Sequence, residues 1–341
     1  MILFLFLLLL VTSFKCKISR TSFYKDYLSR EQTLCVNGIF MAYILLSHTF
    51  NVYSSSNILN DSFNAIQIYL GQFPVVPILF FSGYGIMESI KHKENYIKNF
   101  PKQRLLKFYY KFFLITLIYV VLNILLREYD LTTVLLSFTG FESIGNGGWY
   151  IGVTLAVYIF VIVCFNIFKN KPALAATMVT VLTAIMMFIE MKLDFPTYYY
   201  STMIFMPLGL CFSLVKHRFD AIVMKNNFAW AVSLVLCLGL SVFFNILTDK
   251  SFIFYPVWCF FGLVALMILC MKVRINNAIL LWIGQTSLYN FILQRIPHKL
   301  LLLLNLNDMT FYVFTFVATF MLILIADKLF KPIDKLFKNK G

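Results

Sequence analysis

Residues 33–52 read TLCVNGIFMAYILLSHTFNV, and this stretch decides the fold of the chain. It is largely apolar, and an α-helix needs roughly 20 such residues to cross the hydrocarbon of a bilayer. Similar runs follow at 66–88, 108–126, 149–168, 173–190, 199–215, 228–247, 252–271, 278–303 and 310–327. We therefore predict an all-α, polytopic integral membrane helix bundle with about ten transmembrane helices.

The composition supports the same fold class. Of 341 residues, 60% are hydrophobic and 13% are charged, and the mean hydropathy is +0.81. A soluble domain is typically about 45–50% apolar and roughly 25% charged. One water-soluble core could not bury this excess of apolar side chains. A soluble globular enzyme, a disordered chain and a fibrous repeat are therefore excluded.

The distribution of positive charge predicts the orientation of the bundle. The chain carries 29 Lys and Arg and a net charge of +14, which in a soluble protein would indicate nucleic acid. If successive runs alternate in direction, the basic residues fall on one side, except for Arg127, Lys192, Lys250, Arg295 and Lys299. Cytoplasmic loops carry such an excess of Lys and Arg. We therefore expect both termini in the cytoplasm, a lipid bilayer as partner and no nucleic acid.

This map divides the chain into three segments. We expect a short apolar stretch plus basic cytoplasmic linker at 1–32, one membrane domain at 33–330 and a basic cytoplasmic tail at 331–341. Residues 1–14 are short for a span and lack the basic region and cleavage site of a signal peptide. They are either an interfacial or partly inserted helix or the product of a start codon chosen too early. The cysteines show no C-x-x-C spacing and predict neither a metal site nor a disulfide framework.

Polar and ionisable residues within spans are costly, so they are candidates for function. His48 lies in the outer part of the first run. It is either an interfacial or core histidine that hydrogen-bonds to a neighbouring helix, or a general base in a water-accessible cavity. The ninth run also carries polar residues, and we expect that it does not face lipid throughout; these residues are Gln285, Asn290, Gln294 and Arg295.

The first run resembles the first-span signature of the acyltransferase 3 family of membrane O-acyltransferases. That signature is a basic residue followed directly by a glycine and an apolar helix, with a histidine separated from the basic residue by ten residues. Gly38 and His48 match it, whereas Asn37 stands at the basic position. Asn37 supplies no positive charge, so either another basic group replaces it or the substrate differs.

Further segments resemble the same family in the same order. Residues 80–84, FFSGY, resemble its F-x-S-G-aromatic segment, and residues 101–109, PKQRLLKFY, resemble its basic R-x-x-R segment. Residues 148–158 begin GWYI and end in Tyr, as its fourth span does. Residues 283–294 resemble its G-x-x-S segment, with Gln294 where many members have His. The fourth span has Thr154 where one large subgroup is acidic, so an altered or inactive member is an open alternative.

The resemblance implies a fold, a reaction and a location. The family transfers an acyl group, commonly acetyl from cytoplasmic acetyl-CoA, to a hydroxyl of a glycan or glycolipid, often in bacterial surface polysaccharide synthesis. Acetyl-CoA is then a donor substrate and no cofactor stays bound. The resemblance places the chain in a bacterial inner, or cytoplasmic, membrane.

The resemblance also implies roles for single residues. His48 is the general base, while Arg104 and Lys107 bind the CoA phosphates. The alternative for both cations is an ordinary cytoplasmic or lipid-phosphate contact. The residues expected around the substrate or the oxyanion are Asn37, Ser82, Trp149, Tyr150, Tyr289 and Gln294.

Two other classes of protein fit the composition. A polytopic transporter or glycolipid flippase also needs polar residues within spans and broken helices. An oligosaccharide polymerase of surface glycan assembly is the third alternative. Binding of CoA is expected of the acyltransferase alone. The sequence leaves open the acceptor, the acyl chain and whether the protein forms a homo-oligomer.

Overall fold

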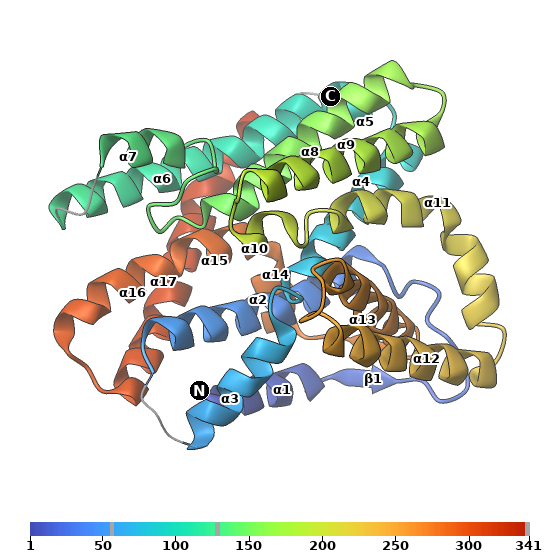
Figure 1. The fold of residues 1–341 in the computed structure, drawn as a ribbon, viewed down its shortest axis with the longest axis horizontal. Helices are drawn as coiled ribbons and strands as arrows, with labels where there is room; N and C mark the ends of the chain where they lie inside the picture. Colours follow the sequence, from blue (N-terminus) through green and yellow to red (C-terminus); the bar gives the residue numbers. More distant parts are fainter. Residues whose placement is uncertain (55–57, 127–129, 338–341) are drawn as a thin grey trace.

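The computed structural model describes residues 1–54, 58–126 and 130–337 of the chain. It is a helical bundle with one small sheet, as Figure 1 shows. Over these residues, eight helical segments are long and apolar enough to cross a membrane. They are Arg30–Val52, Asn60–His92, Tyr96–Leu125, Gly148–Ile167, Pro172–Lys192, Thr197–Val223, Asn227–Ile246 and Asp308–Leu336. The prediction of a polytopic helical membrane bundle is confirmed.

Several of these segments contain more than one helix. The helices within the eight segments are α2 (Arg30–Val52), α3 (Ile58–Leu70), α4 (Val75–His92), α5 (Tyr96–Phe100), the π-helix η1 (Pro101–Leu106), α6 (Lys107–Leu125), α8 (Gly148–Ile167), α9 (Pro172–Lys192), α10 (Thr197–Tyr200), α11 (Phe205–Val223), α12 (Asn227–Ile246) and α17 (Asp308–Leu336). A short helix, α7 (Leu131–Ser137), lies between α6 and α8.

The two remaining apolar runs are also helical. The run expected at 252–271 forms α13 (Phe254–Cys270), a helix of 17 residues. The polar run expected at 278–303 is broken into α14 (Ala278–Gln285), α15 (Ser287–Leu293), α16 (Arg295–Leu301) and a 3-10 turn, η2 (Leu302–Leu304). This broken helix is buried along much of its length, because α2, α6 and α17 pack around it.

The N-terminal segment belongs to the bundle. Helix α1 (Ile2–Ser13) packs against α2 and α3, and strand β1 (Cys16–Ile18) pairs antiparallel with β2 (Val273–Ile275). The amino group of Met1 donates to Asn60 at the beginning of α3, while Asn277 donates to the Val11 carbonyl near β2. Helix α1 is therefore tied to α3 at its beginning and to the chain between β2 and α14 near its end. The small sheet was not anticipated from the sequence.

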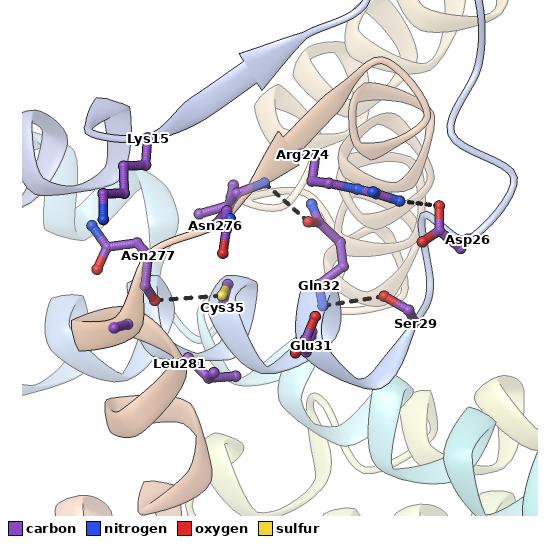
Figure 2. Close-up of a pocket in the computed structure, with 12 residues that line it drawn as sticks. Lys15, Asp26, Ser29, Glu31, Gln32, Cys35, Arg274, Asn276, Asn277 and Leu281 are labelled. Atoms are coloured by element: carbon purple, nitrogen blue, oxygen red, sulfur yellow. Dashed lines mark hydrogen bonds and ion pairs between the residues drawn. The ribbon is translucent and has the colours of Figure 1, made fainter.

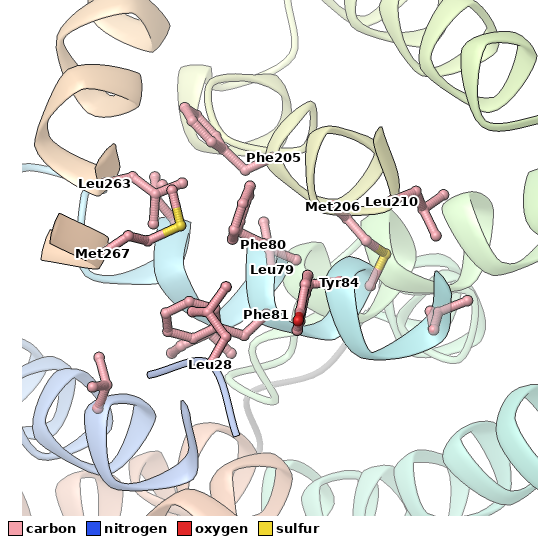
Figure 3. Close-up of a cluster of buried hydrophobic side chains, with 14 of the residues drawn as sticks. Leu28, Leu79, Phe80, Phe81, Tyr84, Phe205, Met206, Leu210, Leu263 and Met267 are labelled. Carbon is pink, nitrogen blue, oxygen red and sulfur yellow. The ribbon is translucent and has the colours of Figure 1, made fainter. Parts of the chain in front are cut away.

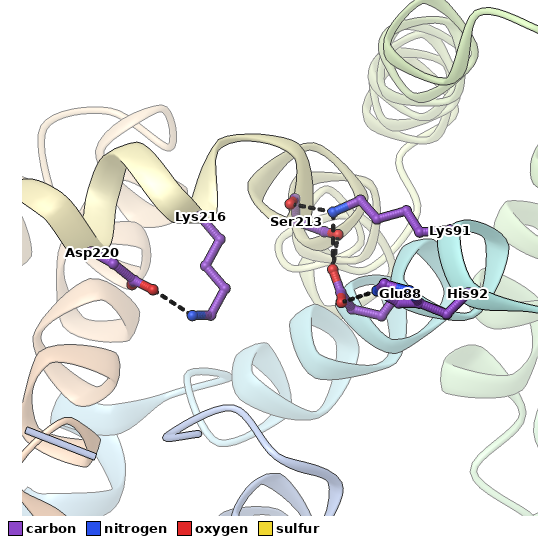
Figure 4. A network of polar contacts seen from close by, with 6 residues as sticks. All are labelled: Glu88, Lys91, His92, Ser213, Lys216 and Asp220. Atoms are coloured by element: carbon purple, nitrogen blue, oxygen red, sulfur yellow. Dashed lines mark hydrogen bonds and ion pairs between the residues drawn. The ribbon is translucent and has the colours of Figure 1, made fainter. Parts of the chain in front are cut away.

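Contacts between loops agree with the alternating map. On the side expected to be cytoplasmic, Tyr27 donates to Asp220 at 2.9 Å, and burial together with this carboxylate raises the tyrosine pKa. Figure 4 shows the neighbouring group there, in which Lys91 bridges Glu88 of α4 and the Ser213 carbonyl of α11.

On the opposite side, Tyr53 donates to the Leu306 carbonyl and Lys299 donates to Asn123. These pairs and the cytoplasmic-side pairs each join segments that the map assigns to one side.

Two helix pairs approach each other through glycines. A Cβ atom at Gly38 of α2 would lie 2.0 Å from the Leu280 carbonyl oxygen of α14, and one at Gly284 would lie 2.0 Å from that of Leu34. Such small residues allow backbones in membranes to pack closely.

The second pair is α4 and α11. A Cβ atom at Gly83 would lie 1.8 Å from the Met206 carbonyl oxygen, and one at Gly209 would lie 2.1 Å from that of Phe80. Figure 3 shows the apolar side chains of α4 and α11 that surround this contact. The glycines of the FFSGY and I-G-Q-T-S segments thus have a packing role.

Gly83→Ala is expected to lower the midpoint of heat-induced aggregation by about 5 °C, because overpacking typically costs about 1–3 kcal/mol. Gly85→Ala in the same helix is the matched control, since an added Cβ there meets nothing within 4 Å. Size-exclusion of the heated, detergent-solubilised protein measures both midpoints. Equal midpoints for the two variants would contradict the close α4–α11 contact.

Candidate functional site

His48 borders a cavity of about 160 Å³ at the end of α2 away from the sheet. Helices from four parts of the chain form this cavity. Its lining residues are Tyr43, Ile44, Ser47, His48 and Asn51 of α2, Gln67 of α3, Gly71, Gln72, Pro74 and Val75 around the α3–α4 turn, Trp149 of α8 and Phe291 of α15. The lining therefore includes hydroxyl, amide and imidazole groups as well as apolar side chains.

The His48 ring is held between aromatic and amide neighbours. Its centroid lies 6.2 Å from that of Phe291, and the Gln294 side chain is a near neighbour. The His48 Nδ1 atom is buried and has no hydrogen-bond partner among the described residues. The Gln294 amide donates to the Phe291 carbonyl at 3.0 Å, and its buried Oε1 atom has no hydrogen-bond partner among the described residues. The imidazole therefore has unused hydrogen-bonding capacity next to a cavity.

The Phe291 ring also contacts two aromatic residues of α8, next to His48. Its ring lies 5.9 Å from that of Trp149 and 4.7 Å from that of Tyr150, measured between centroids. Four residues expected at one site, His48, Trp149, Tyr150 and Gln294, are thus gathered around Phe291, a residue that the sequence analysis did not single out.

Two more ionisable residues of α16 lie beside His48. His298 is 2% exposed, and its Nε2 atom lies 3.0 Å from the Thr49 hydroxyl. The Arg295 guanidinium is close enough to interact electrostatically with both imidazoles, and no carboxylate pairs with it within the described part of the chain. The sequence held one signal for Arg295: it is one of the few basic residues on the non-cytoplasmic side of the charge map.

A second polar group lies further toward the sheet end of the bundle. Arg104 donates to the Tyr96 hydroxyl at 3.2 Å and lies near the phenol of Tyr158, which contacts the Ser82 hydroxyl. Tyr158 follows Trp149 by nine residues, or about 13 Å along α8. Helices α4 and α8 therefore contribute to both places. Val75 and Trp149 line the His48 cavity, and Ser82 and Tyr158 lie in the Arg104 group.

The other expected residues lie elsewhere. Lys107 forms an ion pair of 3.1 Å with Asp334 of α17, so it does not join Arg104. Tyr289 stacks on Phe330 of α17 at 5.5 Å and belongs to the α6–α17 packing rather than to the His48 cavity. Asn37 is buried on α2, and its Oδ1 atom has no partner among the described residues.

A third polar feature is a pocket of about 280 Å³ at the sheet end of the bundle, shown in Figure 2. Arg274 pairs there with Asp26, and Gln32 of α2 accepts from the Ile275 amide at 3.0 Å. Cys35 lies at its wall and donates to the Asn277 carbonyl at 3.7 Å. Charges of both signs line this pocket, so it does not define a phosphate site by itself.

Comparison with known proteins adds no assignment. No family model, no curated protein and no solved structure matches the chain. Within the described ranges, no group of three or more His, Cys, Asp or Glu side chains is arranged to hold a metal ion. The chemistry of the site therefore rests on its own side chains.

A cysteine at Ser47 is expected to react with a membrane-impermeant thiosulfonate, because Ser47 lines the cavity next to the exposed Asn51 at the end of α2. Met41→Cys is the control, since Met41 is 1% exposed and is expected to be unreactive. Both variants are made with the native cysteines replaced, and a gel shift measures labelling. Equal protection of both cysteines would show that water does not reach the cavity.

Proposed function

We propose that this chain is a membrane O-acyltransferase that moves an acyl group from cytoplasmic acyl-CoA to a hydroxyl of a surface or exported glycan. The observation that carries the proposal is His48, an imidazole with an unpaired buried nitrogen beside a polar cavity. The excess of basic residues at the sheet end of the bundle supports a cytoplasmic location for that end. The His48 cavity then lies toward the opposite face of a bacterial cytoplasmic membrane.

Two polar groups on shared helices suit a donor and an acceptor that arrive from opposite sides. Arg104 is a guanidinium with no carboxylate partner in the described structure, and it is suited to a CoA phosphate. His48 lies about 16 Å beyond Asn37 along α2, so a pantetheine arm must extend into the bundle to reach it. Ser82 and Tyr158 lie near Arg104 along this route. Lys107 is assigned a smaller role because Asp334 already pairs with it.

The chemical step follows from these positions. His48 accepts the proton of the acceptor hydroxyl while the hydroxyl oxygen attacks the thioester carbonyl. The tetrahedral intermediate then collapses, the C–S bond breaks, and the departing CoA sulfur takes up the proton from the imidazolium. Arg295 and the Gln294 amide are the nearby groups suited to stabilise the oxyanion. A cavity of about 160 Å³ favours acetyl over a long acyl chain.

One observation favours a second candidate function. The ninth run is broken into three short helices around polar residues, and discontinuous helices of this kind form binding sites in transporters and flippases. A flippase or polymerase of glycan assembly would need no CoA and no general base. The two experiments below separate these classes from an acyltransferase.

His48→Ala is expected to lower acyl transfer at least about 100-fold, since a general base typically contributes 10²–10⁴-fold. His92→Ala is the matched control, because the His92 side chain is 72% exposed at the end of α4. Membranes of cells that express each chain receive radiolabelled acetyl-CoA, and label in glycan is counted. Label in the parent and equal label in the His48 variant would remove the base from the mechanism.

Arg104→Gln is expected to raise the KM for acetyl-CoA about 10- to 100-fold, as loss of one charge-assisted hydrogen bond costs about 1.5–3 kcal/mol. The control is Lys102→Gln, a cation on the same π-helix that does not donate to Tyr96 as Arg104 does. Initial rates in membrane vesicles give both constants. An unchanged KM in the Arg104 variant would place the CoA phosphates elsewhere.

A further inference from the structure

The two ring nitrogens of His48 have different surroundings. A neutral imidazole carries one hydrogen, on Nδ1 or on Nε2, and only the other nitrogen can accept a proton. The Nδ1 atom of His48 is buried, whereas the half-buried ring lines the cavity. Nε2 is therefore the ring nitrogen that can face the cavity. A base that acts on a hydroxyl in the cavity needs its hydrogen on Nδ1.

The Gln294 side chain offers a hydrogen-bond acceptor to this Nδ1 atom. Its amide nitrogen donates to the Phe291 carbonyl at 3.0 Å, and a carbonyl can only accept, so this contact fixes which end of the amide is the oxygen. The Gln294 Oε1 atom is buried and has no hydrogen-bond partner among the described residues, and the same is true of Nδ1 of the neighbouring His48. The amide oxygen can accept only from an N–H. A pairing of these two atoms therefore requires the hydrogen on Nδ1.

Burial of two complementary polar atoms without a hydrogen bond is unfavourable. Hydrogen bonds of catalytic groups are often long in ligand-free enzymes and shorten when the substrate binds. The alternative donor near His48 is the guanidinium of Arg295, which has N–H groups and no acceptor. If Arg295 donated to Nδ1, the hydrogen of the imidazole would lie on Nε2, toward the cavity. The two arrangements thus predict opposite tautomers.

His298 carries its hydrogen on Nε2. The Thr49 hydroxyl donates to the Leu45 carbonyl at 2.7 Å, and a hydroxyl has a single hydrogen. Toward His298 this hydroxyl can therefore only accept, so the Nε2 atom that lies 3.0 Å from it is protonated. His298 does not line the His48 cavity. Its hydrogen bond joins α16 to α2 at the residue next to His48.

We propose that Gln294 is a positioning residue that holds His48 as the Nδ1-protonated tautomer, so that Nε2 accepts the proton of the acceptor hydroxyl. The role of Nε2 rests on the proposed function, whereas the tautomer does not. The Gln294 oxygen keeps its bond to Nδ1–H while Nε2 takes up the proton and then passes it to the CoA sulfur. A neutral amide thus has the orienting role that a carboxylate has in a Ser-His-Asp triad.

The test is nitrogen NMR of the full chain, isotopically labelled in its histidines and reconstituted in phosphatidylcholine vesicles at a pH above the ordinary pKa of histidine. In the parent chain we expect the hydrogen of His48 on Nδ1 and that of His298 on Nε2, with His48→Ala to assign the signals. Gln294→Met has no amide oxygen. It is expected to convert His48 to a mixture of tautomers and to lower kcat about ten-fold with an unchanged KM for acetyl-CoA, the effect of one lost hydrogen bond.

Two further variants separate the hydrogen bond from packing. Gln294→Glu keeps an acceptor oxygen beside His48, so the parental tautomer is expected to remain. Gln285→Met is the matched control, because Gln285 is exposed on α14, and it is expected to change neither the tautomer nor kcat.

The outcomes separate this inference from the proposed function. A parental His48 with its hydrogen on Nε2, or a folded Gln294→Met chain in which Nδ1 stays fully protonated, overturns the role of Gln294 while the acyltransferase stands. The expected tautomers in a parent chain that transfers no acetyl group support the hydrogen bond and overturn the acyltransferase. The parental spectrum decides the tautomer even where a variant does not fold.

Discussion

The close approach of α2 to α14 through Gly38 and Gly284 is the contact on which the candidate site depends. Each glycine lies against a carbonyl of the other helix, at distances that no side chain would allow. This contact fixes the broken helix α14–α16 alongside α2. Beyond it, Phe291, Gln294 and His298 reach the level of His48 and Thr49. A larger separation of α2 from α14 would move the Gln294 amide and the His298 imidazole away from His48.

The second glycine contact, between α4 and α11, holds α4 in place beside the candidate site. Helix α4 carries Val75 at the His48 cavity and Ser82 at the Arg104 group, and its packing against α11 fixes both. The two glycine contacts thus place Arg104 and His48 relative to one another. The small sheet ties the N-terminal segment to the chain before α14.

Much of the fold could be predicted from the sequence, because hydropathy and charge can be evaluated from consecutive residues without knowledge of tertiary contacts. Runs of apolar residues predicted the positions of the helices, and basic loops predicted which loops meet. The polar ninth run was expected to avoid full contact with lipid, and it is broken and largely buried. The pairing of β1 with β2 could not be predicted, since three-residue strands far apart in sequence carry no periodic signal.

The candidate site was harder to predict, because side-chain direction depends on tertiary packing. Arg104 and Lys107 are three residues apart, yet one faces Tyr96 and the other faces Asp334 of α17. The π-helix Pro101–Leu106 changes the angular spacing there, and such turns are frequent at functional sites. Arg295 and His298 lie near His48 only because the packing of the chain brings α16 to the end of α2.

Binding of acetyl-CoA to the purified chain is the property that distinguishes an acyltransferase from a transporter or a polymerase. Isothermal titration in detergent micelles measures it without any knowledge of the acceptor. We expect saturable binding at one site per chain, and weaker binding when the 3′-phosphate of CoA is removed. Absence of binding at millimolar acetyl-CoA, in a preparation that is monodisperse and folded, would contradict the acyltransferase and favour a transporter or polymerase.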